Sequence, residues 1–238
     1  PMPLDNLSAT YADGCLYVAG GKGKPQTVPI GQDGSQTAPT NPLFSLQLTP
    51  SLQKEWVRLP DFPGPARIQP VLTAQQSEDG IRLYLAGGFQ PASAHQEAIV
   101  CTDMLSYHPK TKQWRNEGFL PSLAGGSHRT VTGGCAIASG DSSILLVGGV
   151  NYDRFRDALN HPEPDYLLHP VDWYKFNTSL LQYNTFTKHW THLGNYEELA
   201  RAGAGIANNA NTVIIIGGEL KPGIRTPEVN AFKLTCHP

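Results

Sequence analysis

The sequence has little net charge and no long apolar run. Its 18 Lys and Arg residues nearly balance its 20 Asp and Glu residues, so the formal net charge is −2. The basic surface that marks a nucleic-acid-binding protein is therefore missing. No stretch of about 18 apolar residues exists that could cross a bilayer as a helix. These absences argue against nucleic-acid and membrane partners, and they leave oligomerisation open.

Paired cysteines and grouped histidines are also missing. The four cysteines form no Cys-x-x-Cys pair, and the eight histidines show no ligand spacing. We therefore expect neither a structural zinc site nor another cofactor. No basic segment followed by an apolar one opens the chain, so no signal peptide is visible. A signal could have been removed, or could lie upstream of this sequence.

Glycine and proline are abundant, at 24 and 20 of 238 residues. This is too little for a low-complexity chain and suits many short strands joined by tight turns. With 39% hydrophobic and 16% charged residues, the chain is long enough and apolar enough to bury a core.

A repeat organises the sequence. Four apolar segments each end in a pair of glycines, and the first glycines of successive pairs are 67, 61 and 69 residues apart. A tryptophan follows each of the first three pairs after one more expected strand. The pairs are Gly20-Gly21, Gly87-Gly88, Gly148-Gly149 and Gly217-Gly218, and the tryptophans are Trp56, Trp114 and Trp190.

An apolar strand closed by two glycines and followed by a turn and a tryptophan is the kelch pattern. Glycines let neighbouring blades approach closely, and the tryptophan fills the space between blades. The sequence therefore predicts an all-β, kelch-type β-propeller. We expect a single domain over 1–238, with blades at about 8–60, 66–120, 130–195 and 201–238.

The fourth unit lacks its tryptophan strand. Kelch rings usually hold six or seven blades, and at ~50 residues per repeat six blades need ~300 residues. We therefore expect a six-bladed ring of which this chain shows four blades. The remaining two would lie upstream, downstream or on another chain.

Two long insertions separate the second and third strands of their units, at Lys22–Pro42 and Asn151–Asn177. In a propeller this connection lies on one fixed face, so both insertions should crowd the same mouth of the channel, where binding groups are common. The second insertion is rich in aromatic residues, which could stack on a sugar ring or simply pack the loop.

Glu219 follows the fourth diglycine, at the start of the equivalent connection. Lys221-Pro222-Gly223 predicts a tight turn that brings Arg225 back toward Glu219. A carboxylate and a guanidinium at a channel mouth suit a substrate with a hydroxyl proton to move and a carboxylate to hold. From the spacing alone, a surface salt bridge that fixes the loop is the favoured interpretation.

The segment Gly218–Thr226 resembles the active-site segment of the N-acetylneuraminate epimerase family, which are sialic acid mutarotases built as six-bladed kelch propellers. Asp172–Leu181, Gly148–Asn151 and Pro65–Arg67 are similar to further family segments. The order of units matches the family's first four blades. A cyclically permuted group within the family places the other two blades first, which would mean that this sequence starts part-way through its protein.

This resemblance implies anomerisation of N-acetylneuraminate from the α to the β form, without metal or redox chemistry. Glu219 would act as general base on the anomeric hydroxyl, and Arg225 would hold the sugar carboxylate or the developing oxyanion. Arg67, Asn151 and Asn177 are candidate substrate-binding residues. The family's mutarotation is periplasmic, so we expect a periplasmic or secreted protein.

Three other functions are possible for a propeller of this kind. A non-catalytic kelch interaction module explains the repeats but leaves the Glu–Arg motif without a role. A sialidase would carry the Ser-x-Asp-x-Gly-x-x-Trp box, which this sequence lacks. A copper oxidase on a kelch frame needs a Cys–Tyr pair and clustered histidines, for which the sequence shows no pattern.

Overall fold

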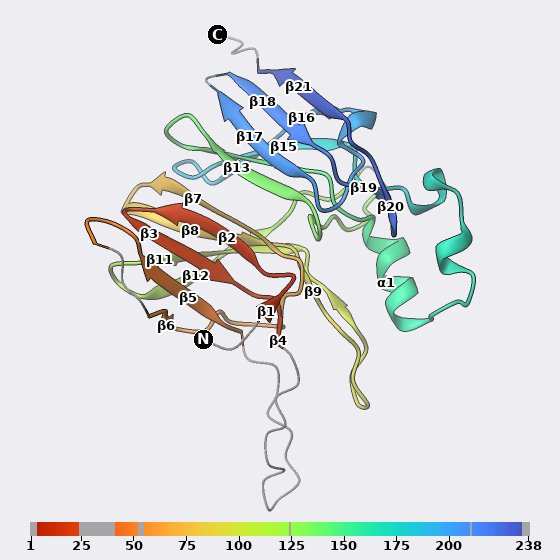
Figure 1. Cartoon of the computed structure of the whole chain (residues 1–238), viewed down its shortest axis with the longest axis horizontal. Helices are drawn as coiled ribbons and strands as arrows, with labels where there is room; N and C mark the ends of the chain where they lie inside the picture. The colour runs from red at the N-terminus through yellow and green to blue at the C-terminus, as the bar shows by residue number, and fades with distance from the viewer. Residues whose placement is uncertain (1–3, 24–40, 52–54, 124, 210, 235–238) are drawn as a thin grey trace, which may run out of the picture.

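Four blade sheets form the molecule (Figure 1). The computed structural model describes residues 4–23, 41–51, 55–123, 125–209 and 211–234. Nearly all of the regular structure is β, and the predicted all-β propeller with four blades is confirmed. Most of the Lys22–Pro42 insertion lies outside the described residues. Among the described residues, no helix is long and apolar enough to span a membrane.

The first three blades are antiparallel sheets of four strands in chain order, and the fourth has three described strands. Blade one contains β2 (Ser8–Ala12), β3 (Cys15–Ala19), β5 (Leu43–Gln47) and β6 (Val57–Leu59). Blade two contains β7 (Val71–Ser77), β8 (Gly80–Ala86), β11 (Asp103–His108) and β12 (Gln113–Phe119). Blade three contains β13 (Cys135–Ser139), β14 (Ser143–Val147), β15 (Ser179–Asn184) and β16 (His189–Asn195). Blade four contains β17 (Gly205–Asn209), β18 (Thr212–Ile216) and β21 (Val229–Lys233).

Most of the short elements lie in the connections between the second and third strands of the blades. Three two-stranded ribbons pair β1 (Leu4–Asp5) with β4 (Lys22–Gly23), β9 (Phe89–Gln90) with β10 (Ile99–Val100), and β19 (Glu219–Lys221) with β20 (Ile224–Arg225). The insertion in blade three forms α1 (Tyr152–Asn160), η1 (Tyr166–Leu168) and η2 (Val171–Tyr174), and η3 (Glu197–Leu199) precedes blade four. Figure 1 shows α1, β9, β19 and β20 together at one side of the blade sheets.

Hydrophobic clusters fill the spaces between successive blades. Leu43 of blade one packs with Leu83 and Tyr107 of blade two, and the next two interfaces repeat the arrangement. Trp114 and Trp190 lie in these clusters as the repeat predicts, and Trp114 packs against Tyr107 with ring centroids 5.0 Å apart. Trp56 directly precedes β6 and belongs to none of the three clusters. Burial of apolar side chains between blades is the main stabilisation of such a stack.

In the first three pairs, the first glycine lies against the segment that leads into the next blade. A Cβ atom at Gly20 would stand 2.4 Å from the carbonyl oxygen of Arg67, and one at Gly148 would stand 2.6 Å from that of Arg201. Contacts this short leave no room for any side chain. The diglycines are therefore needed for the close approach of blade to blade.

Backbone hydrogen bonds also connect the starts of the four blades. Gln69 N–H donates to Asn6 O (2.8 Å), Gly133 N–H to Gln69 O (2.9 Å) and Gly203 N–H to Gly133 O (2.6 Å). Each bond joins equivalent positions of neighbouring blades, two residues before the first strand. These four residues form a chain of hydrogen bonds, which we call the entrance chain.

Candidate active site

Glu219 and Arg225 face each other across the β19–β20 hairpin. They are direct partners in its antiparallel register, and Pro222 and Gly223 form the turn between the strands. Arg225 Nε stands 3.4 Å from Glu219 Oε1. The glutamate side chain is 31% exposed and the arginine side chain 82%. Exposure of this kind makes the pair weak as a stabilising interaction and accessible to a ligand.

The backbone of Glu219 is fixed against the start of blade four. Its N–H donates to Ala202 O (2.7 Å) and its carbonyl accepts from Ala202 N–H (3.0 Å). Gly218 makes this approach possible, because a Cβ atom there would stand 3.0 Å from Ala202 O at a φ of +105°. Gly218 therefore lets the carboxylate-bearing residue lie directly against the start of blade four.

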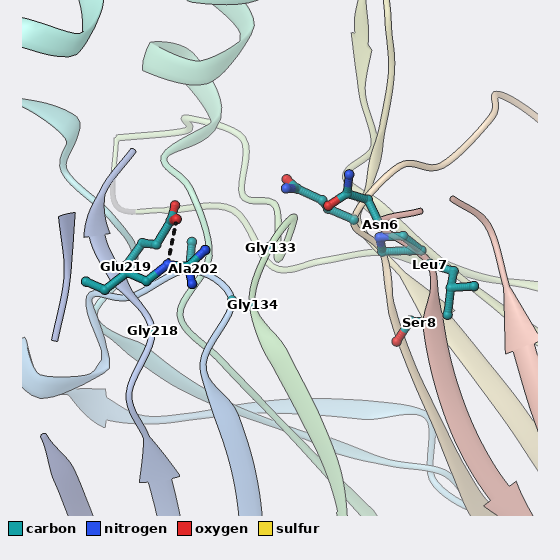
Figure 2. Close-up of a pocket in the computed structure, with 12 residues that line it drawn as sticks. Asn6, Leu7, Ser8, Gly133, Gly134, Ala202, Gly218 and Glu219 are labelled. Atoms are coloured by element: carbon teal, nitrogen blue, oxygen red, sulfur yellow. Dashed lines mark hydrogen bonds and ion pairs between the residues drawn. The ribbon is translucent and has the colours of Figure 1, made fainter. Parts of the chain in front are cut away.

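A cavity of about 480 Å³ opens beside this carboxylate. Figure 2 shows Glu219 and Gly218 on one side of it and Asn6, Leu7 and Ser8 on the other, with Gly133 and Gly134 between them. The lining consists of the entrance chain and its neighbours from all four blades, together with the hairpin pair. Its full set is Asn6, Leu7, Ser8, Gln69, Pro70, Gly133, Gly134, Ala202, Gly203, Gly218, Glu219 and Arg225.

Only Glu219 and Arg225 carry charge among the described residues that line the cavity. The remaining lining offers amide and hydroxyl groups and several glycines, which leave room for a ligand between the blades. A carboxylate can accept a proton from a bound hydroxyl, and a guanidinium can hold a carboxylate with two hydrogen bonds. The volume falls in the range of small-molecule sites.

Lys221 ties the same hairpin to the insertion of blade three. Its Nζ donates to the carbonyl oxygens of His169 (2.6 Å) and Leu167 (3.1 Å). The ammonium also stands 5.8 Å from the ring centre of Tyr174. The Lys-Pro-Gly turn therefore does more than reverse the chain, since its lysine anchors the turn to a second element.

Arg67 is buried away from the cavity, with 1% of its surface exposed. Its guanidinium holds both carboxylate oxygens of Asp103 at 2.8 Å and the carbonyl oxygen of Gly87 at 2.9 Å. Arg201 does the same in blade four, where it bonds Gly217 O and the carboxylate of Glu228. This repetition favours a structural role, and substrate binding by Arg67 stays a prediction.

Asn177 bonds the corresponding diglycine carbonyl in blade three, that of Gly148, although it precedes the third strand of its blade and not the first. Its amide nitrogen donates to the carbonyl oxygens of Thr130 (2.7 Å), Val150 (2.9 Å) and Gly148 (3.3 Å). Asn151 is the N-cap of α1, where its side chain accepts from Arg154 N–H at 3.0 Å. Neither asparagine lines the cavity. Both hold the backbone of the insertion, and substrate binding by either also stays a prediction.

The aromatic residues of the insertion pack on one another and on the protein. Tyr174 and Phe176 are buried in a small cluster. Trp173 is stacked against His169 at 3.9 Å, and Arg154 lies 4.6 Å from its ring centre. None of these rings lines the cavity beside Glu219, so the packing alternative is favoured over sugar stacking.

One cluster of potential metal ligands occurs in the described part of the chain, formed by Glu163, Asp165 and His169. Both carboxylates are exposed, and none of the three residues lines the cavity. Exposed acidic groups of this kind are common without a metal. The cluster therefore adds nothing to the chemistry of the Glu219–Arg225 pair.

Fold and site together define a kelch-type β-propeller with a Glu–Arg pair in a cavity lined by residues of all four blades. Among solved structures, one titled "Structure of YjhT" matches the whole chain with a TM-score of 0.71 and 22% identity, over 68% of that chain. This match concerns the fold alone.

The family model for N-acetylneuraminate epimerase matches residues 18–237, and the chain belongs to that family. The curated N-acetylneuraminate epimerase of Haemophilus influenzae (strain PittEE) is 30% identical over 95% of this chain and 60% of its own length. That of Pasteurella multocida (strain Pm70) is 27% identical over 84% of this chain and 52% of its own length. The chain thus spans about half to three fifths of these relatives.

Nothing in the sequence, taken residue by residue, points to the rest of the cavity lining. Gln69, Gly133 and Gly203 are unremarkable as residue types, and they meet only because each precedes the first strand of a blade. Their equivalent positions in the repeat are the signal that could have revealed them.

Proposed function

We propose that the protein interconverts the α and β anomers of N-acetylneuraminate, with Glu219 as the general base. The proposal rests on the position of the Glu219–Arg225 pair in a cavity that all four blades line. The chain also belongs to the N-acetylneuraminate epimerase family. The sugar acid has a hydroxyl proton and a carboxylate, which match the two charged groups of the cavity.

In the proposed reaction, a Glu219 oxygen takes the proton of the anomeric hydroxyl. A carbonyl forms at the anomeric carbon, the bond from that carbon to the ring oxygen breaks, and the ring oxygen receives a proton. The carbonyl then turns its other face to the ring hydroxyl. Ring closure returns the proton and gives the opposite anomer, so no atoms or electrons are gained or lost.

Arg225 is proposed to hold the carboxylate of the sugar. Its side chain is largely exposed and meets Glu219 through Nε, so its two terminal nitrogens are available for a bidentate contact. This contact would orient the anomeric carbon, which carries the carboxylate, toward Glu219. A neutral sugar would lose it.

The number of blades in the complete ring and the location of the protein are also proposals. The three described strands of blade four and the length of the relatives support a six-bladed ring, to which 1–238 would contribute four blades as one unit. A periplasmic or secreted location is proposed from the family resemblance and can be tested by cell fractionation.

Proton NMR of the anomeric exchange tests the function. A sialidase releases the α anomer from a sialoside, and the decay of its signals is followed with and without the protein. We expect accelerated exchange of N-acetylneuraminate and none of N-acetylmannosamine, which lacks the carboxylate. Arg225→Met should raise KM more than it lowers kcat, and exchange at the spontaneous rate with wild-type protein would contradict the proposal.

A non-catalytic kelch module remains the main alternative. It would bind the sugar acid through the same pair without changing the exchange rate. The NMR assay separates the two, because binding alone broadens or shifts the sugar signals without shortening the lifetime of the α anomer.

A further inference from the structure

A second cavity lies between blades two and three, apart from the one beside Glu219. Its volume is about 380 Å³, and it shares no lining residue with the first. The segment that follows β12 and the outer strand β16 enclose it. The lining consists of Pro121, Ser122, Leu123, Arg129, Trp190, His192 and Asn195.

Arg129 is the unusual member of this lining. It is 7% exposed, and its Nε and Nη1 atoms are buried without a hydrogen-bond partner. No salt bridge to it occurs among the described residues. Burial lowers the pKa of its guanidinium, and no neighbouring carboxylate opposes that shift. The other buried arginines, Arg67, Arg82 and Arg201, each hold a carboxylate at 2.8 Å.

An unpaired buried charge is costly, and the cost is recovered when an anion reaches it. The groups around Arg129 are suited to the rest of an organic ligand. Asn195 Oδ1 accepts a hydrogen bond from Ser179 Oγ (3.0 Å) and lies 3.1 Å from His192 Nε2. These two contacts fix the orientation of the Asn195 amide. Trp190 contributes an aromatic surface that is packed on Tyr183 behind it, with ring centroids 4.8 Å apart.

We propose that this cavity is a second binding site, which takes a small hydroxylated organic carboxylate with its carboxylate on Arg129. One guanidinium matches one carboxylate, and a doubly charged phosphate would meet no second Lys or Arg in the described lining. Ser122, His192 and Asn195 offer hydrogen bonds to hydroxyl groups, and Trp190 packs against the carbon face. Both blades that form the site belong to this chain.

Titration calorimetry with three probes tests the proposal. Sodium D-glucuronate is the carboxylate probe, D-glucose is its counterpart without the carboxylate, and sodium phosphate is the inorganic anion, all at equal ionic strength. We expect binding of glucuronate only. Equal binding of glucose, or binding of phosphate alone, would overturn the carboxylate assignment, and no binding of any probe would overturn the site.

Variants locate the binding. Arg129→Gln should weaken glucuronate binding roughly tenfold or more, whereas Arg115→Gln, at an exposed arginine of blade two, should bind as wild type. His192→Glu places a carboxylate at the exposed rim and should also abolish binding. If Arg129→Gln does not fold, the His192→Glu protein tests the location of the site instead.

The glucuronate binding that Arg129→Gln and His192→Glu remove must persist in the Arg225→Met protein, because the first cavity is separate. If Arg225→Met removes the binding and Arg129→Gln and His192→Glu do not, the probe occupies the cavity beside Glu219 and the proposal is wrong. This measurement does not use turnover, so it stands or falls independently of the proposed epimerase activity.

Discussion

Replacing Lys221 by Met tests whether the Glu219–Arg225 hairpin depends on its anchor. Methionine keeps an unbranched side chain of similar length and removes the ammonium. The hydrogen bonds to His169 O (2.6 Å) and Leu167 O (3.1 Å) are then lost, along with the contact with Tyr174. Glu219 and Arg225 remain in place chemically, so only the position of the hairpin is perturbed.

The magnitude follows from the two hydrogen bonds. A bond from a charged donor contributes about 1.5–3 kcal/mol. Water can replace part of this at the two carbonyls, because Leu167 is 59% exposed and His169 is half-buried. We therefore take the value of one bond, and since about 1.4 kcal/mol is tenfold in rate, we expect kcat to fall roughly 10- to 100-fold.

The assay is the NMR anomeric exchange of N-acetylneuraminate over a range of sugar concentrations. Lys221→Arg should recover part of the lost rate, because a guanidinium can also donate to both carbonyls. Lys110→Met, at an exposed turn of blade two, serves as the control and should exchange at the wild-type rate. A wild-type kcat for Lys221→Met would refute the reasoning.

Three further predictions concern the frame of the site. Asp103→Ala leaves the buried charge of Arg67 unpaired and should lower the free energy of unfolding by about 3–5 kcal/mol; an unchanged urea midpoint would show the pair to be unimportant. Hydrogen bonds from Arg82 hold the pKa of Asp79 well below its usual value, so this carboxylate stabilises the fold at neutral pH and the effect is lost on acidification. The Tm advantage of wild type over Asp79→Asn should thus shrink below about pH 4, and an advantage constant with pH would be inconsistent with this linkage. Gly218→Ala forces a Cβ atom to 3.0 Å from a backbone carbonyl and should reduce the exchange rate roughly tenfold; full activity would mean that the hairpin tolerates the shift.

Much of the fold could be predicted because the repeat carries its own register. The diglycines mark the ends of the second strands, and the structure shows why, since Gly20 and Gly148 touch the next blade. The Glu219–Arg225 pairing could also be predicted, because a short turn joins the two residues.

Contacts between distant residues could not be predicted in the same way. Arg67 is a candidate for substrate binding through the family resemblance of Pro65–Arg67, and nothing local in the sequence shows that Asp103, 36 residues later, holds its guanidinium. The α1 helix was also missed, although Asn151 followed by the acidic Asp153 is a helix-start signal. The unpartnered Arg129 shows no sequence pattern at all.

The central claim is that Glu219 moves the proton of the anomeric hydroxyl. Anomeric exchange of N-acetylneuraminate by the Glu219→Gln protein tests it most directly, because glutamine preserves size and hydrogen bonding but cannot act as the base. Glu198→Gln, at an exposed residue of η3, is the matched control. We expect Glu219→Gln to lower kcat by about 10²- to 10⁴-fold and Glu198→Gln to leave kcat unchanged. Exchange by Glu219→Gln at the wild-type rate would contradict the assignment.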